Sequence, residues 1–408
     1  MKLQFNMLIF NSNQKSFYFF LLVFFLLSIG VYENSSTKHF DKLAIVLSSF
    51  IFVYLISSKF IKDKYLDFNK IFNIKVAFLD IKFLNLFLLI ISITLIILDM
   101  VVLGGPPIVK ALSSSNLKTF CDIREDIHND SSKIFVYLSS VNIKAILPFT
   151  LFHFVVLNKK KIFIPLVLLA GLYGFSMMQK SFMFSIFFPT ISYILIQKKW
   201  ILSISLTLIL LIGVFSLTVL LNKYIDDEEK DDEEKIVKVQ SNQTPFLFRL
   251  SKGLIKRVVI VPGETISQWF NVIPEKKPYL YGDGYPIIAK LRARKYIDYS
   301  KELYPILKPD YAKKGLSGTV NVASFVREYS NFGYLGLFWG GALIALVLVF
   351  IDKMFLGYEN FYYSINLFPI FLFSSSSILT ILFSGGWFVF ILLFFIFYKS
   401  YNQQICAE

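Results

Sequence analysis

The stretch FLNLFLLIISITLIILDMVVLG, residues 83–104, decides the fold of this chain because Asp99 is its only charged residue. About 20 predominantly apolar residues in an α-helix cross the roughly 30 Å of hydrocarbon in a bilayer. Nine further stretches of similar character are found at 16–32, 40–58, 134–157, 161–178, 181–197, 199–221, 333–352, 361–377 and 379–398. The sequence therefore predicts an all-α polytopic integral membrane protein with about ten transmembrane helices.

The composition agrees with this class. The 408 residues are 55% hydrophobic and have a mean hydropathy of +0.61, values typical of membrane proteins. The spacing of the apolar stretches predicts an N-terminal transmembrane bundle of about seven helices at 1–221. It then predicts one large, partly helical loop at 222–332. Residues 333–408 are expected to form about three more transmembrane helices and a short tail.

Lysines are concentrated in alternate loops. They crowd the loop at 59–82, recur at 159–161, and recur again at 198–199 beside Trp200. Short loops rich in lysine and arginine face the cytoplasm, and tryptophan favours the membrane interface. We therefore expect these three loops to be cytoplasmic.

This orientation places both termini in the cytoplasm and the segments 104–133 and 222–332 on the outer face. In a soluble protein a net charge of +14 would suggest a nucleic-acid partner. Here the lysines that fix the orientation account for it, so no nucleic-acid partner is expected.

The loop at 222–332 contains five of the six arginines, Arg249, Arg257, Arg292, Arg294 and Arg327. The planar guanidinium grips phosphate with two parallel hydrogen bonds and stays charged when partly desolvated. A chain that uses lysine elsewhere and gathers arginine on one side of a membrane is expected to bind an anion there. Ordinary salt bridges within the loop are the alternative.

Two parts of the loop favour amphipathic helices. The first, PFLFRLSKGLIKRVVIVPGE at 245–264, is expected to end at its Pro-Gly pair; its cationic face would comprise Arg249, Lys252, Lys256 and Arg257. Such a helix lies along a membrane surface, where it binds either lipid headgroups in general or one lipid diphosphate. The second, at 285–306, separates Arg292 from Arg294 by about 200°. Arg292 is then the candidate ligand, and Arg294 is expected to pair with Asp298.

The loop closes with NVASFVREYSNFGYLGLFWGG, residues 321–341. Glu328 lies just outside the next span and is a candidate general base, with a salt bridge as its alternative role. The glycines that follow form a stripe that allows either close helix packing or room for a lipid tail. Deeper in the bilayer, Lys144 is expected to reach toward Asp99, because ionisable residues at such depth need partners.

Motifs for metal-dependent or nucleophile-elbow hydrolysis are absent. The sequence has no HExxH, no clustered His/Cys set, no P-loop and no GxSxG, so no metal and no cofactor is predicted.

With its large late loop, the chain resembles the O-antigen polymerase (Wzy) family of oligosaccharide repeat-unit polymerases. Two local patterns carry the resemblance, RVVIVPG at 257–263 and EYSNFGYLG at 328–336. The resemblance implies an architecture like that of GT-C membrane glycosyltransferases, in the bacterial inner membrane. It also implies that a glycan on undecaprenyl diphosphate is transferred to the non-reducing end of a new lipid-linked repeat unit.

In that reaction the expected catalytic residues are Glu328, Arg257 and Arg327. The expected ligands of the diphosphate are Arg249, Arg257, Lys256 and Arg292. The implied partners are the lipid-linked oligosaccharide and membrane lipid, together with a chain-length regulator and a flippase. Two alternatives remain, an O-antigen ligase and a non-enzymatic polysaccharide flippase or transporter.

Overall fold

The computed structural model describes residues 14–34, 39–61, 81–113, 123, 132–232 and 256–405. All of their regular secondary structure is helical, and they contain no strand. Six helices are long and apolar enough to cross a membrane: Lys15–Asn34, Phe40–Phe60, Lys82–Leu112, Ile134–Val156, Trp200–Leu220 and Ser324–Met354. The protein is therefore an all-α integral membrane protein.

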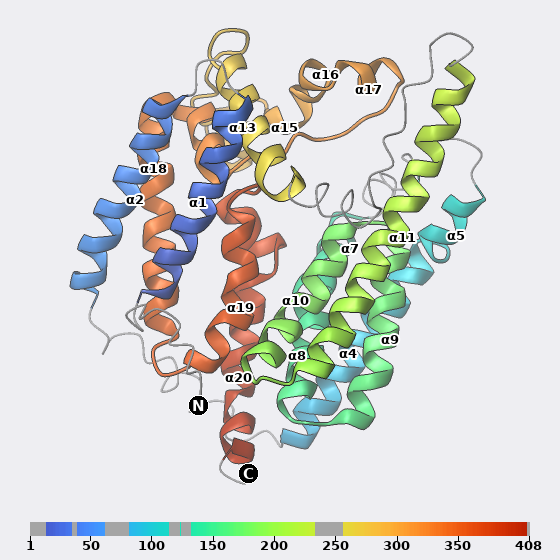
Figure 1. Ribbon diagram of the computed structural model, residues 1–408. Coiled ribbons are helices and arrows are strands. Elements are labelled where there is room, and N and C mark those ends of the chain that lie inside the picture. The colour runs from blue at the N-terminus through green and yellow to red at the C-terminus, as the bar shows by residue number, and fades with distance from the viewer. Residues whose placement is uncertain are drawn as a thin grey trace, which may run out of the picture. The chain divides into compact units, whose positions relative to one another are not determined.

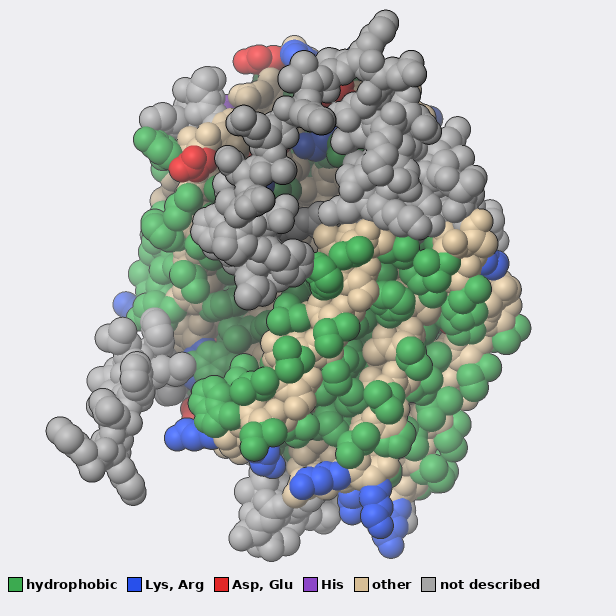
Figure 2. Space-filling model, turned by 45° about the vertical axis from the view of Figure 1, so that its right-hand side comes forward, with side chains coloured by type: hydrophobic (Ala, Val, Ile, Leu, Met, Phe, Trp, Pro, Cys, Tyr) green, Lys and Arg blue, Asp and Glu red, His purple; other side chains and the backbone are tan. Residues whose placement is uncertain are grey.

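The chain folds as two units, each with its own helices. The first comprises 1–67, 240–359 and 369–380, and the second comprises 68–239, 360–368 and 381–408. Apolar side chains cover much of the face shown in Figure 2.

The first unit is built on three long helices, α1 (Lys15–Asn34), α2 (Phe40–Phe60) and α18 (Ser324–Met354) (Figure 1). The short π-helix η3 (Lys256–Ile260) runs into α13 (Val261–Val272), and both pack on α1. The residues that follow α13, 273–323, include four short helices, α14 (Pro286–Leu291), α15 (Tyr299–Glu302), α16 (Tyr304–Leu307) and α17 (Pro309–Lys313).

Contacts at the two ends of the first unit place the loop. At one end Asp352 of α18 accepts hydrogen bonds from the backbone N–H and hydroxyl of Ser16 and from the Tyr54 hydroxyl. At the other end the Ser267 hydroxyl of α13 donates to the backbone oxygen of Val31 at 3.4 Å. The loop therefore lies at the end of this helix bundle opposite Asp352.

Glycine permits the close approach between the loop and α1. A Cβ added to Gly263 would lie 2.2 Å from the backbone carbon of Gly30, and a Cβ on Gly30 would lie 2.3 Å from the oxygen of Val259. The expectation that Pro262 and Gly263 end a helix is wrong, because α13 starts there and has proline in its first turn. Proline is suited to that position because a first-turn N–H has no intrahelical acceptor.

The second unit contains α4 (Ile81–Val102), α5 (Pro107–Leu112), α7 (Lys133–Val141), π-helix η2 (Asn142–Ile146) and α8 (Leu147–Val156). It continues through α9 (Lys160–Ser176), α10 (Lys180–Ile196) and α11 (Trp200–Asp232). The C-terminal part adds α19 (Glu359–Leu372), which contributes to both units, π-helix η4 (Thr380–Ser384) and α20 (Trp387–Ile405). Each of the ten predicted spans contains helical structure, but only six helices among the described residues are long and apolar enough to cross a membrane. Two of the predicted spans are interrupted: α19 ends at Leu372 within 361–377, and residues 385–386 break the helix within 379–398.

The two charges expected to pair inside the second unit do not do so. Asp99 accepts hydrogen bonds from the hydroxyls of Ser139, at 2.8 Å, and Tyr173. Lys144 instead donates to the backbone oxygen of Ser384 at 3.4 Å. The pairing prediction is wrong because neighbouring hydroxyl and carbonyl groups satisfy both ions.

Candidate functional site

A reversal of the chain at Gly333 positions the candidate site. Gly333 has φ 63° and ψ −141° inside α18, a conformation that only glycine adopts readily. In a straight helix Glu328 and Gly336 would be about 12 Å apart. Instead, a Cβ on Gly336 would lie 2.1 Å from the backbone oxygen of Glu328. Residues 324–332, here called the entry arm, therefore fold back along the rest of α18.

The glycine stripe of the sequence serves this close packing. A Cβ on Gly340 would lie 2.9 Å from the Cα of Phe325 in the entry arm, and a Cβ on Gly341 would lie 2.5 Å from the backbone oxygen of Val46 in α2. Of the two roles considered for the stripe, close helix approach is the one observed.

Backbone hydrogen bonds connect the entry arm to the loop segment that precedes α14. The N–H groups of Leu280 and Tyr281 donate to the backbone oxygens of Ser330 and Asn331, at 2.9 and 2.8 Å. The amide of Asn331 in turn accepts from the N–H of Gly284 at 3.1 Å. These bonds fix the loop on the arm and form one wall of a cavity.

The cavity has a volume of about 370 Å³ and lies wholly within the first unit. Three segments that are distant in sequence surround it: the α14–α15 region, the entry arm with the residues before it, and the serine-rich link after α19. Its polar lining comprises Tyr296, Asp298, Tyr299, Ser300, Asn321, Arg327, Ser330, Asn331, Ser375, Ser376, Ser377 and Thr380.

Arg327 provides the cation of this cavity. Its guanidinium donates to the Ser377 hydroxyl at 3.2 Å and to the backbone oxygen of Gly284 at 3.1 Å. The guanidinium carbon also lies 5.5 Å from the ring centre of Tyr285, within the range of a cation–π contact. Among the residues that the structure describes, these acceptors are neutral and no carboxylate hydrogen-bonds to the guanidinium. The neighbouring Glu328 carboxyl interacts with it through its charge.

Aromatic and hydroxyl groups complete the lining. Trp269 is 3% exposed, and its indole N–H has no hydrogen-bond acceptor among the residues that the structure describes. Burial and the charge of Glu302 raise the pKa of Tyr299 to about 12. Burial and the charge of Asp298 also raise the pKa of Tyr296. Both phenols therefore remain protonated near neutral pH. The Tyr299 hydroxyl donates to the backbone oxygen of Pro278 at 2.7 Å, so toward a ligand it can only accept. Together with the serine hydroxyls and amides, this wall suits a ligand rich in hydroxyl groups.

Glu328 lies beside this cavity but is not part of its lining. Glu328 is buried, with 8% of the residue exposed, and its carboxyl accepts a hydrogen bond from the hydroxyl of Tyr285. The residues on either side of Tyr285 line the cavity. Burial and the Glu328 carboxylate raise the pKa of Tyr285. The hydrogen bond with Tyr285 therefore connects Glu328 to the cavity wall.

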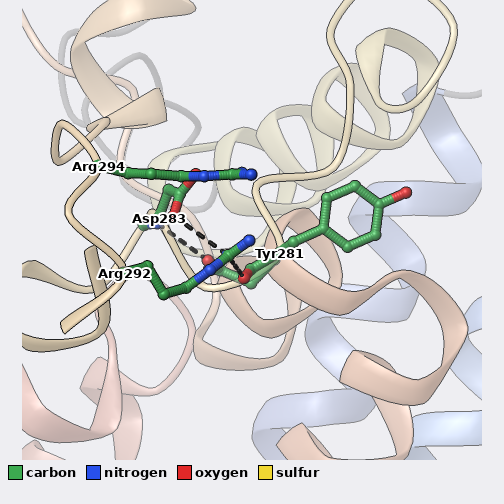
Figure 3. Close-up of polar contacts among 6 residues, drawn as sticks. Tyr281, Asp283, Arg292 and Arg294 are labelled. Atoms are coloured by element: carbon green, nitrogen blue, oxygen red, sulfur yellow. Dashed lines mark hydrogen bonds and ion pairs between the residues drawn. The ribbon is translucent and has the colours of Figure 1, made fainter. Parts of the chain in front are cut away.

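Arg292 and Arg294 lie outside the cavity lining and share one carboxylate (Figure 3). Arg292 contacts Asp283 at 3.2 Å and also donates to the backbone oxygen of Tyr281. Arg294 contacts the other oxygen of Asp283 at 3.3 Å.

The expected helix at 285–306 is interrupted after Leu291, where Ala293 has φ 53°. This turn brings Arg292 and Arg294 to the same side. The predicted pairing of Arg294 with Asp298 is wrong, because Asp298 accepts from the N–H and hydroxyl of Ser300 at the start of α15.

The other predicted ligands lie upstream. Lys256 is exposed at the start of η3. The backbone of Arg257 follows it in η3, but its side chain lies outside what the structure describes, as does Arg249 entirely. Their roles stay predictions.

Sequence reasoning missed most of the cavity. Asp298 was predicted only to form a salt bridge with Arg294, and the serines at 374–377 were predicted to end a transmembrane helix. That run of four serines is the one signal that could have been noticed, since it places hydroxyls at a helix end. Comparison with known proteins found no matching family model, no matching curated protein and no matching solved structure.

Proposed function

We propose that this chain is a membrane glycosyltransferase that polymerises lipid-linked oligosaccharide repeat units. The growing glycan on undecaprenyl diphosphate would be transferred to the non-reducing end of a new lipid-linked unit. The proposal includes ten spans in a bacterial inner membrane, cytoplasmic termini and a periplasmic loop at 222–332. The resemblance to repeat-unit polymerases motivates it.

The observation that carries the proposal is the position of Arg327. Its guanidinium donates hydrogen bonds to neutral groups of the described residues, in a cavity lined by hydroxyls, amides, aromatic rings and the carboxylate of Asp298. A sugar diphosphate combines an anion with many hydroxyl groups, and this lining complements both. The cavity also belongs to the loop end of the first unit, opposite Asp352.

In the proposed step the acceptor hydroxyl oxygen attacks the anomeric carbon, and the bond from that carbon to the diphosphate oxygen breaks. The electron pair leaves with undecaprenyl diphosphate, and the acceptor proton passes to a protein carboxylate. Preorganised cations stabilise the charge that grows on the leaving group, and loss of one such donor typically costs about 3 kcal/mol. Arg327 would supply this stabilisation.

Glu328 remains the proposed base. Asp298 also presents a carboxylate to the cavity, but one of its oxygens already accepts two hydrogen bonds from Ser300. Glu328 is buried next to Arg327 and bonded to Tyr285. If Glu328 is the base, Glu328→Gln loses most activity, whereas Asp298→Asn loses little.

Arg249, Lys256 and Arg257 remain the proposed ligands of the donor diphosphate, on the segment that leads into α13. Arg292 can join them only if its contact with Asp283 opens, because the carboxylate now neutralises it. Arg327 therefore becomes the leading candidate among the described arginines.

The test is chain extension by purified protein in vesicles with lipid-linked repeat units, read as a ladder on a gel. We expect Arg327→Ala to reduce extension on the order of 10²–10³-fold and Arg327→Lys to retain part of it. Arg294→Ala serves as the matched control, since this arginine is 57% exposed and lies outside the cavity lining. A full ladder from Arg327→Ala would overturn the assignment.

In cells, deletion separates the three functions considered. A missing polymerase leaves single repeats attached to the core, a missing ligase leaves none attached, and a missing flippase retains intermediates on the cytoplasmic side. Single repeats are the expected result.

A further inference from the structure

A second hollow lies in the other unit, at the turns that join α8 to α9 and α10 to α11. It has a volume of about 760 Å³ and is lined by Lys160, Lys198 and Lys199 together with Phe163, Trp200 and Ile201. We call it the basic groove. None of the residues proposed for catalysis lines it.

Two tight turns create the groove. Asn158 and Lys198 have positive φ values of 53° and 58°, and each reverses the chain between two helices. As a result α9 and α11 both begin at the groove, and these two helices are in contact. The positive ends of their dipoles add to the charge of the lysines.

The three lysines are exposed, and no acidic side chain that the structure describes lies within ion-pair distance of them. The groove therefore carries a positive charge that its described surroundings do not neutralise. Unpaired cations gathered in one hollow favour an anionic ligand.

The apolar wall identifies that ligand as a lipid. Trp200 is 60% exposed and Ile201 is 85% exposed, and both start α11, an apolar helix long enough to span a membrane. A soluble anion gains nothing from such a wall, whereas a phospholipid needs both a cationic site for its headgroup and an apolar surface for its chains. Basic hollows beside membrane helices bind anionic headgroups in this way.

We propose that the basic groove binds one anionic phospholipid, with the headgroup phosphate among the three lysines and the acyl chains along Phe163 and Ile201. The groove and the cavity belong to different units and share no lining residue. The bound lipid is therefore distinct from the lipid-linked substrate proposed for the cavity, and this inference does not depend on the proposed function.

Trp200 gives a local readout, because bromine on a lipid chain quenches tryptophan fluorescence on contact. The protein is placed in phosphatidylcholine vesicles that contain a small fraction of either brominated phosphatidylglycerol or brominated phosphatidylcholine. Brominated phosphatidylglycerol should quench more strongly. Trp200→Phe should remove most of the difference, which locates the signal at the groove.

Each lysine near an anionic headgroup is worth about fivefold in affinity. The triple variant Lys160→Ala/Lys198→Ala/Lys199→Ala should therefore lower the preference for phosphatidylglycerol on the order of 10²-fold. The matched control Lys295→Ala/Lys301→Ala/Lys313→Ala removes three exposed lysines of the first unit and should leave the preference unchanged.

Quenching by brominated phosphatidylcholine should be the same in the wild type, the triple variant and the control, which all keep Trp200, and this checks that each is folded. Equal quenching by both lipids would overturn the proposal, and so would a preference that survives in the triple variant or disappears in the control. Loss of the preference on adding inorganic phosphate, at matched ionic strength, would assign the groove to a soluble anion instead and would equally overturn it.

Discussion

Replacement of Gly336 by alanine tests the chain reversal that places Arg327 at the cavity. The new Cβ would lie 2.1 Å from the backbone oxygen of Glu328, whereas ordinary contact begins at 3.4 Å. The entry arm would have to move by about 1.3 Å, the difference between these distances. Because the clash is with backbone, no rotamer change relieves it, and overpacking of this kind costs about 1–3 kcal/mol.

The same movement would displace the guanidinium of Arg327, because Arg327 directly precedes Glu328 in the entry arm. A misplacement of about 1 Å can lower a rate on the order of 10²-fold. We therefore expect Gly336→Ala to reduce chain extension by about that factor and to lower the midpoint of thermal unfolding in detergent.

Gly171→Ala is the matched control, because a Cβ there meets only side-chain atoms, at 3.8 and 3.9 Å. It should preserve both activity and thermal stability. If Gly336→Ala behaves like Gly171→Ala in both assays, the entry arm does not pack against the following helix as described, and the derivation of the site fails.

Three further predictions concern other contacts. Asp352→Ala should destabilise the protein by about 3 kcal/mol, because it leaves buried donors unpaired. Tyr54→Phe should lower the stability less in the Asp352→Ala variant than in the wild type. If the two losses of stability measured by thermal unfolding are additive, the two residues are not coupled. Burial and a neighbouring carboxylate raise the pKa of Tyr285 above 10.0, so the stability it adds is complete below about pH 10 and falls as the pH rises toward the folded-state pKa. Tyr285→Phe should remove this alkaline loss from the unfolding profile, and an unaltered profile would count against the bond. Arg292→Ala should make the loop more sensitive to proteolysis than Arg294→Ala does. The Arg292 side chain also donates to a backbone oxygen and is 34% exposed, whereas that of Arg294 is 57% exposed. Equal cleavage of the two variants would contradict this ranking.

The membrane helices could be predicted from sequence because their length follows from the apolar run alone. The span predicted at 40–58 corresponds to the helix Phe40–Phe60, and the span predicted at 16–32 corresponds to the helix Lys15–Asn34. Burial of apolar side chains in lipid needs no particular partner. Such elements are therefore encoded locally.

The errors arose where a distant partner decided the local structure. The Pro-Gly pair at 262–263 reads equally well as a helix end and as a first turn, and only the contact with Gly30 distinguishes the two. Likewise, the reversal at Gly333 looks like one more glycine in a stripe. Nothing in the sequence marks which glycine leaves the helix.

The site was predicted only in part for the same reason. Arg327 was identified because arginine is rare in this chain, a property visible without structure. The partners of Arg327 were not identified, because Ser377 follows α19 and Gly284 precedes Arg327 by more than forty residues. Asp283 was missed as the partner of two arginines because the turn at Ala293 follows no helical period.

The contact between Gly30 and Gly263 constrains the order of biogenesis. A ribosome must synthesise more than two hundred residues between these glycines, including most of the second unit. During that interval the first helix has inserted but lacks the loop that will cover it. Helices α4 to α11 of the other unit can therefore pack early, although η4 and α20, which complete that unit, are synthesised last. The cavity closes only after translation has passed the serines at 375–377, so a chain truncated before them would keep its first membrane helices and lose its site.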